Sequence, residues 1–130
     1  LKVLYQMKNI IIIMTLFSSL FGANAQQNDT IKILNPSDFK DAIKSKDVQL
    51  VDVRTADEFK AGAIESALNI DFFQQENFTE EFEKLDKEQP VYLYCRSGSR
   101  SQQAAGKLKA MGFTKIYDLQ GGYMGWPFKG

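Results

Sequence analysis

The chain contains a single cysteine, Cys95, which stands where an apolar run ends and a run of small and charged residues begins. Five residues complete this loop, which are Arg96, Ser97, Gly98, Ser99 and Arg100. Small residues and a glycine let a backbone curl tightly, so that successive amide N–H groups point inward and bind an anion. A helix-like pattern follows, and its N-terminus adds positive charge. The loop therefore predicts covalent catalysis by a Cys95 thiolate on an anionic substrate.

Two plainer interpretations of Cys95 compete with this one. A free cysteine is often a small core residue that ends a strand, and the loop alternatively binds phosphate beside an incidental thiol. A core cysteine has no need of two arginines and three small residues, so the neighbours favour chemistry. The loop also lacks the Gly-x-x-x-x-Gly-Lys-Ser/Thr order of a nucleotide-binding loop.

The composition of the chain excludes several classes of protein and several kinds of catalytic or metal site. A chain of 130 residues, 44% hydrophobic and 25% charged, indicates one globular domain. A formal net charge of zero argues against a nucleic-acid partner. The absence of histidine excludes Ser-His-Asp and Cys-His catalysis and most zinc sites, and one cysteine excludes an internal disulfide. We expect neither a metal nor an organic cofactor.

The N-terminal residues are typical of an export signal. Met7 and Lys8 precede an apolar run at residues 10–21, and Ala23 and Ala25 form a small-x-small cleavage site. The run is shorter than the ~20 apolar residues of a membrane span. We therefore expect residues 1–25 to be a signal peptide, with translation beginning at Met7. After cleavage, we expect no stable membrane span. A linker at residues 26–32 and one domain at residues 33–130 would follow, in the periplasm or outside the cell.

Strands and helices alternate along the remaining sequence. Apolar, β-branched runs predict strands at residues 31–34, 48–53, 67–70, 91–94 and 115–119. Capping residues and helical spacing predict helices capped by Ser37 and Thr55 and at residues 79–85 and 101–111. This alternation indicates an α/β fold with a mainly parallel sheet, in which ligands bind at the carboxyl ends of the strands. Cys95 ends one such strand, and Asp52 and Arg54 lie at the end of another.

Aromatic residues and a glycine pair mark the surroundings of this edge. Gly121 and Gly122 predict a turn, and with Tyr123 and Trp126 they are candidates for the mouth of a pocket. A plainer interpretation, which we favour for the following aromatic residues, is that they belong to the core or form an apolar cover over the site: Phe72, Phe73, Phe78, Trp126 and Phe128.

Three motifs together resemble the single-domain rhodaneses, a family of sulfurtransferases. "LVDVRTADEF" at residues 50–59, "VYLYCRSGSRS" at residues 91–101 and "LQGGYMGW" at residues 119–126 occur in the family's order and with similar spacing. The resemblance implies a three-layer α/β domain, with a mainly parallel five-stranded sheet flanked by helices. It also implies that Cys95 carries a persulfide, that residues 96–100 complete the active-site loop, and that Asp52 and Arg54 support this loop.

The activity implied by the resemblance is the transfer of a sulfane sulfur. Cys95 would take the sulfur from a small anionic donor such as thiosulfate and pass it to cyanide or a thiol, including a protein thiol. We expect Arg96 to steer the donor, Arg100 to close the loop, and Ser97 and Ser99 to donate hydrogen bonds.

Several alternatives stay open. Related phosphatases and arsenate reductases have five residues between cysteine and arginine, whereas four separate Cys95 from Arg100, and Ser101 follows. A non-catalytic module that binds an anion or a partner is a second alternative. A redox thiol protein is a third, disfavoured because the chain has no second cysteine. Asp52 and Arg54 equally fit a purely structural ion pair.

One position departs from the family pattern. Ala63 stands where a Gly-His-Ile sequence usually has histidine. Since that position has no proposed role in the chemistry, we expect sulfur transfer to persist.

Overall fold

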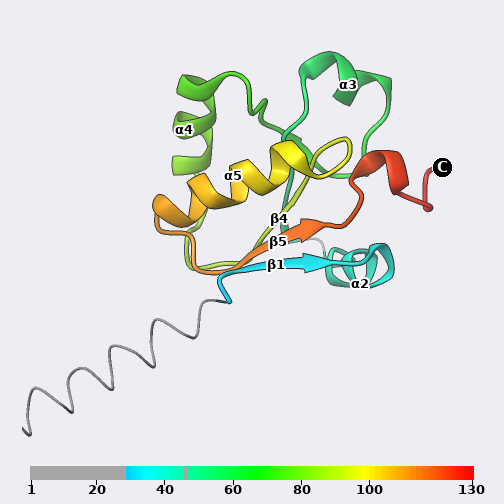
Figure 1. Cartoon of the computed structure of the whole chain (residues 1–130), viewed down its shortest axis with the longest axis horizontal. Helices are drawn as coiled ribbons and strands as arrows, with labels where there is room; N and C mark the ends of the chain where they lie inside the picture. Colours follow the sequence, from blue (N-terminus) through cyan, green and yellow to red (C-terminus); the bar gives the residue numbers. More distant parts are fainter. Residues whose placement is uncertain (1–28, 46) are drawn as a thin grey trace, which may run out of the picture.

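The fold is a parallel five-stranded sheet between two layers of helices, seen in a computed structural model that describes residues 29–45 and 47–130 (Figure 1). The strands are β1 (Ile31–Leu34), β2 (Gln49–Asp52), β3 (Leu68–Asn69), β4 (Val91–Tyr94) and β5 (Ile116–Leu119). Their order in the sheet is β1-β5-β4-β2-β3, and every neighbouring pair is parallel. The predicted α/β fold with a mainly parallel sheet is confirmed.

The helices cover both faces of this sheet. They are α2 (Pro36–Ala42), α3 (Ala56–Ala61), α4 (Gln75–Glu83), α5 (Ser99–Ala110) and the short 3-10 helix η1 (Tyr123–Gly125). Helices α4 and α5 lie over one face and α2 lies against the other (Figure 1). The predicted signal peptide at residues 1–25 lies outside the described residues. Within residues 29–45 and 47–130, no helix has the length and apolar character to cross a membrane.

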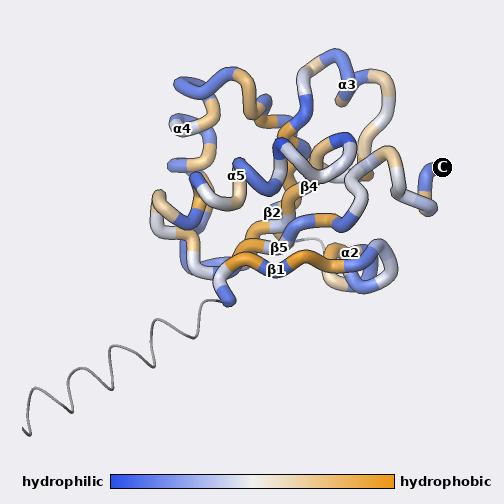
Figure 2. Tube along the Cα trace, in the orientation of Figure 1, coloured by the Kyte–Doolittle hydropathy of each residue, from blue (hydrophilic) through white to orange (hydrophobic). Residues whose placement is uncertain are grey.

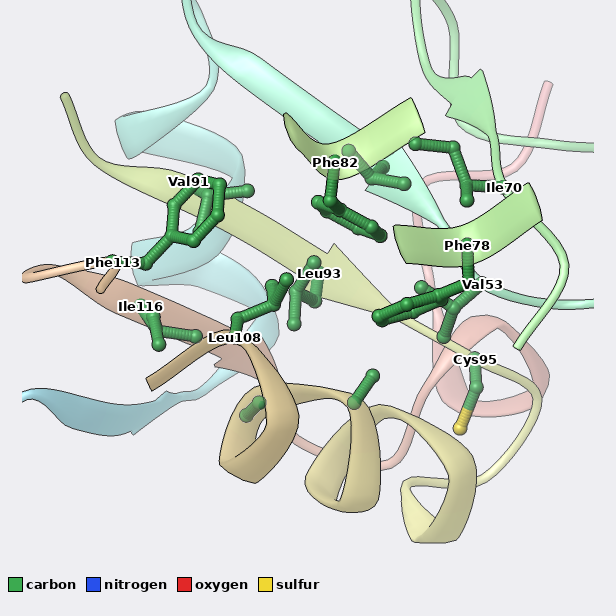
Figure 3. Packing of buried hydrophobic residues seen from close by; sticks show 13 residues of the cluster. Val53, Ile70, Phe78, Phe82, Val91, Leu93, Cys95, Leu108, Phe113 and Ile116 are labelled. Atoms are coloured by element: carbon green, nitrogen blue, oxygen red, sulfur yellow. The ribbon is translucent and has the colours of Figure 1, made fainter. Parts of the chain in front are cut away.

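Alternation along the strands divides the core into two clusters. Because successive side chains of a strand point to opposite faces, Leu93 and Cys95 join the cluster beneath α4 and α5, whereas Tyr94 joins the cluster beneath α2. The strands are mostly apolar, whereas the helices mix hydrophilic and apolar residues (Figure 2). Figure 3 shows Phe78 and Phe82 of α4 packing near β4, in the same buried cluster as Leu108 of α5.

The local signals placed some helix ends correctly and misplaced others. Thr55 caps α3 as predicted, and the structure adds that it does so in a reciprocal capping box with Glu58. The predicted N-cap Ser37 is wrong: the Asn35 side chain accepts a hydrogen bond from the Asp38 amide at 2.8 Å. Proline is favoured in the first helical position, so Pro36 belongs inside α2.

Two further helices begin earlier than predicted. Helix α4 starts at Gln75 rather than at residue 79, because Phe78 and Phe82, four residues apart, both pack into the core. Helix α5 starts at Ser99 rather than at residue 101, directly after the turn at Gly98.

The aromatic residues expected in the core divide into buried and exposed groups. Phe78 and Trp126 are buried and Phe72 is half-buried, as predicted. Phe73 is 61% exposed, and Phe128 is 41% exposed, with its ring 4.0 Å from Lys40 Nζ. These two rings therefore lie at the surface of the protein and not in its core.

The aromatic side chains of α4 that pack into the core should contribute strongly to the free energy of unfolding. Truncation of the fully buried Phe82 to alanine removes contacts with Phe78 and Phe113, and we expect it to lower the free energy of unfolding by about 3–5 kcal/mol. The matched control Phe73→Ala deletes the same atoms from an exposed site and should cost about 1 kcal/mol or less. Urea unfolding of the two variants measures the difference, and equal losses would contradict this description of the core.

Candidate active site

Cys95 directly follows β4, at the carboxyl end of a central strand of the sheet. Its side chain is 1% exposed, and in Figure 3 its sulfur points toward the start of α5. The Gly98 amide donates a hydrogen bond to Cys95 Sγ at 3.0 Å, and Ser101 Oγ lies 3.3 Å from the same sulfur. The strand and the helix therefore meet at the thiol.

The turn between β4 and α5 aims the N-terminus of α5 at this sulfur. Gly98 has φ 121°, a conformation that side-chain-bearing residues rarely adopt. The amides of Ser99, Arg100 and Ser101 belong to the first turn of α5, where N–H groups have no partner within the helix. With the Gly98 amide, they place a partial positive charge beside the thiol, an arrangement that suits an anionic sulfur.

The two loop arginines have different environments. Arg96 is exposed, whereas the Arg100 guanidinium binds both carboxylate oxygens of Glu58 at 2.7 and 3.0 Å. The Arg100 hydrogen bond is the largest cause that lowers the pKa of Glu58 to about 2, and the same bond raises the pKa of Arg100. Arg100 thus fastens the loop to α3, while the charge of Arg96 faces solvent.

Glu58 and Ser101 were not among the residues predicted for the site. The sequence signal at Glu58 is its position three residues after the N-cap Thr55, which accounts for a capping role. That signal does not indicate its second partner, Arg100. Ser101 stands at the position where a longer loop has arginine, and its hydroxyl contacts the sulfur. The predicted hydroxyl donors Ser97 and Ser99 are exposed side chains.

Asp52 and Arg54 form a buried ion pair on the opposite face of the sheet from the Cys95 side chain. Arg54 Nη2 lies 2.6 Å from Asp52 Oδ2 and also donates to the Gly62 carbonyl at 2.7 Å. Burial lowers the pKa of Arg54, but the hydrogen bond and charge of Asp52 outweigh it, so the pKa is raised. The pair reaches the loop through Tyr123, whose ring centre lies 4.4 Å from the Arg54 guanidinium carbon.

The segment after β5 packs its backbone against the backbone of the loop. The amides of Tyr123 and Met124 donate to the carbonyls of Cys95 and Arg96, at 2.7 and 2.9 Å. Gly122 has φ 63°, and a Cβ there would lie 2.5 Å from the Arg96 carbonyl carbon and oxygen. The glycine pair, predicted as a turn, therefore also supports the active-site loop.

A cavity of about 610 Å³ lies beside α2 and the C-terminal residues. Its lining includes Ala63, Tyr123 and Trp126 but not Cys95. Tyr123 therefore borders a hollow that is separate from the Cys95 thiol.

Comparisons with known proteins agree with this geometry. The family model described as "Rhodanese-like domain" matches residues 35–128, and the chain belongs to this family. It is 36% identical over 110 residues to the Bacillus subtilis protein named "Uncharacterized protein YqhL", a match that covers 85% of this chain and 83% of that protein. It is also 36% identical over 84 residues to thiosulfate sulfurtransferase GlpE of Coxiella burnetii, covering 65% and 76% of the two chains.

Solved structures show the same arrangement of elements. A rhodanese-like domain protein from Staphylococcus aureus superimposes with a TM-score of 0.64 at 29% identity, covering 73% of this chain and 90% of its own. The human single-domain sulfurtransferase TSTD1 superimposes with a TM-score of 0.62 at 26% identity, covering 72% and 93%. The three-layer rhodanese-like fold is thus confirmed.

Gly122 should be intolerant of any side chain. Gly122→Ala places a methyl group against the Arg96 carbonyl and strains the backbone, so we expect a loss of about 1–3 kcal/mol in the free energy of unfolding. The matched control Gly125→Ala meets no atom within 4 Å and should leave stability within about 0.5 kcal/mol. Thermal unfolding of both variants decides, and a tolerated Gly122→Ala would show that the close approach is not required.

The Glu58–Arg100 pair should stabilise the fold in a pH-dependent way. The pKa of Glu58 is lowered from 4.5 to about 2 in the folded protein, so its stabilisation is complete above the unfolded value and is lost as the pH falls toward 2. The stability difference between the wild type and Glu58→Gln should therefore shrink over that range. Glu81→Gln, which alters an exposed pair with Lys84, is the control and should show little effect; matching pH curves would refute the assignment.

Proposed function

We propose that this protein is a sulfurtransferase that carries a sulfane sulfur on Cys95. The observation that supports it most directly is the position of Cys95 Sγ, 3.0 Å from the Gly98 amide and at the N-terminus of α5. Preorganised N–H donors stabilise negative charge where it develops, and an anionic thiolate or persulfide is such a charge. Relatives named thiosulfate sulfurtransferase favour the same reaction class.

The proposed reaction consists of two substitutions at sulfur. The Cys95 thiolate attacks the outer sulfur of thiosulfate, a new S–S bond forms, and the old S–S bond breaks as sulfite leaves with the electron pair. An acceptor, either cyanide or a thiolate, then attacks the outer sulfur of the Cys95 persulfide. The bond to Cys95 Sγ breaks, its electron pair returns to the cysteine, and the product is thiocyanate or a new persulfide.

The two loop arginines have different proposed roles, one electrostatic and one structural. Arg96 is exposed beside the nucleophile, where a cation raises the local concentration of an anionic donor. Arg100 is paired with Glu58, so its contribution is to hold the loop closed. The first-turn amides of α5 remain to bind the outer sulfur.

The ring size of the loop favours sulfur over phosphate. Four residues separate Cys95 from Arg100, and the next residue, Ser101, contacts the sulfur with its hydroxyl. A loop with a further residue before its arginine, as in the related phosphatases, would enclose a larger tetrahedral group. A para-nitrophenyl phosphate assay separates the two functions.

We further propose that the protein is exported and works in the periplasm or outside the cell. The support is the order of Met7 and Lys8, an apolar run at residues 10–21 and a small-x-small site at Ala25. The mass of the protein isolated from each cell fraction and from the medium of its natural host shows at which residue the chain begins. A chain that begins at Gln26 supports export, and an unprocessed cytoplasmic chain refutes it.

Intact mass spectrometry tests the persulfide relay. The reduced protein should gain the mass of one sulfur atom after thiosulfate and return to its original mass after cyanide, with one thiocyanate released per chain. Cys95→Ser, which differs in a single atom, should gain nothing. Absence of the mass gain with thiosulfate and with other sulfane donors would refute the relay and leave a module that binds an anion or a partner.

A further inference from the structure

The cavity of about 610 Å³ beside α2 is not lined by Cys95 and has no role in the proposed sulfur transfer. Three segments far apart in the sequence form its walls, which are the stretch from α2 to β2, residues 63–66, and the chain after β5. In Figure 1, α2 and η1 lie at the same end of the molecule. Cavities of about 300–1,000 Å³ commonly bind small molecules, so this one has room for an organic ligand.

Part of the lining is apolar and belongs to the core. Leu50, Ile64 and Trp126 line the cavity and are 3%, 8% and 6% exposed. The Trp126 ring also packs edge-on against Phe39 and Phe128, with ring centroids 6.0 and 5.0 Å apart. Because the three lining side chains are fixed by packing, the apolar wall is formed before a ligand arrives, and little ordering entropy is lost on binding.

The charged side chains around the cavity are mainly basic. Lys40, Lys44 and Lys129 line it, against one acidic residue, Glu65. Lys44 pairs with Asp41 at 3.0 Å, and its charge is thereby partly neutralised. An excess of positive charge around an apolar cavity favours a ligand that is anionic.

Lys40 and Lys129 have no carboxylate partner within residues 29–45 and 47–130. Lys40 Nζ lies 4.0 Å from the centre of the Phe128 ring, and Lys129 Nζ lies 4.6 Å from that of the Tyr123 ring. Lys129 Nζ also contacts the Met124 carbonyl, at 3.5 Å. An ammonium group has three N–H donors, so both side chains keep donors for the anionic group of a ligand.

Ala63 keeps one side of the cavity open. It is half-buried in the lining, and its methyl group takes less space than the histidine of the family pattern at this position. The departure from that pattern, which has no role in the proposed chemistry, therefore falls on the wall of the cavity. A longer side chain at position 63 is expected to occupy space that a ligand would use.

We propose that the cavity is a binding site for a small organic anion with an apolar body. The ammonium groups of Lys40 and Lys129 attract its anionic group, and Ile64 and Trp126 contact its apolar body. Charge-assisted hydrogen bonds are stronger than neutral ones, and the burial of apolar surface adds to the affinity. The site lies apart from the Cys95 thiol, so the proposal does not depend on the sulfur-transfer function.

Fluorescence titration with two probes tests the site. Anilinonaphthalene sulfonate is an aromatic anion, and phenylnaphthylamine has the same ring system without the sulfonate. Trp126 is the only tryptophan of the chain, so energy transfer from its ring to the bound probe measures binding. We expect both probes to bind at one saturable site, and the sulfonate to bind about fivefold or more tightly than the neutral probe.

Two kinds of variant separate apolar contact from charge. Ala63→Leu adds apolar atoms to the wall and should weaken the binding of both probes about fivefold or more. The double variant Lys40→Met and Lys129→Met should weaken the sulfonate about fivefold or more, and the neutral probe less than about twofold. The matched control Lys84→Met removes an exposed charge at the end of α4, over the other face of the sheet, and should change neither affinity.

Three results would overturn the proposal: unchanged affinity for both probes in Ala63→Leu, an equal loss of sulfonate binding in Lys84→Met, or a loss in Arg96→Met, which would place the probe at the Cys95 loop. Circular dichroism checks that each variant is folded, and Ala63→Val takes the place of an unfolded Ala63→Leu. Cys95→Ser cannot form a persulfide and should bind both probes as the wild type does. Failure of sulfur transfer and failure of this site are therefore distinguished.

Discussion

The site depends on one close contact, between the sulfur of Cys95 and the backbone at the start of α5. The chain ends β4 at the cysteine and must reverse direction within a few residues to lay α5 back over the sheet. Gly98, with φ 121°, makes that turn and donates its amide to the sulfur. Cys95 also belongs to the buried cluster that includes Leu93 and Leu108. The Cys95 thiol is therefore held by the core itself, and its position is set when the sheet and helix pack.

Two distant segments hold the loop at its two ends. Glu58, 42 residues before Arg100, binds that arginine from α3. The backbone amides after β5 donate hydrogen bonds to the carbonyls of Cys95 and Arg96. The two segments approach so closely that only a glycine fits at position 122. A loop fixed in this way has little to reorganise when charge develops at the sulfur, which is the condition for effective electrostatic stabilisation. Arg96 lies between the two attachments and stays exposed to solvent, as its proposed role in steering an anionic donor requires.

Local signals predicted elements well where one residue type decides the conformation. Apolar runs at residues 31–34 and 91–94 became β1 and β4 with the predicted bounds. The Thr55 capping box formed because its partners are three residues apart. The start of α4 was misplaced because Gln74, its N-cap, makes no side-chain capping bond. The helix is fixed instead by Phe78 packing into a core that the sequence does not display.

The sequence by itself determined the position of the single cysteine, the small residues that curl around it, and the alternation of elements that makes the sheet parallel. The tertiary structure decided which side chains meet at the loop. It placed Asp52 and Arg54 on the opposite face from the sulfur, and brought Glu58 to Arg100 and Gln102 to Asp118. These pairings depend on which strands and helices become neighbours and on the face that each residue takes. A local pattern cannot specify them, because the partners lie far apart along the chain.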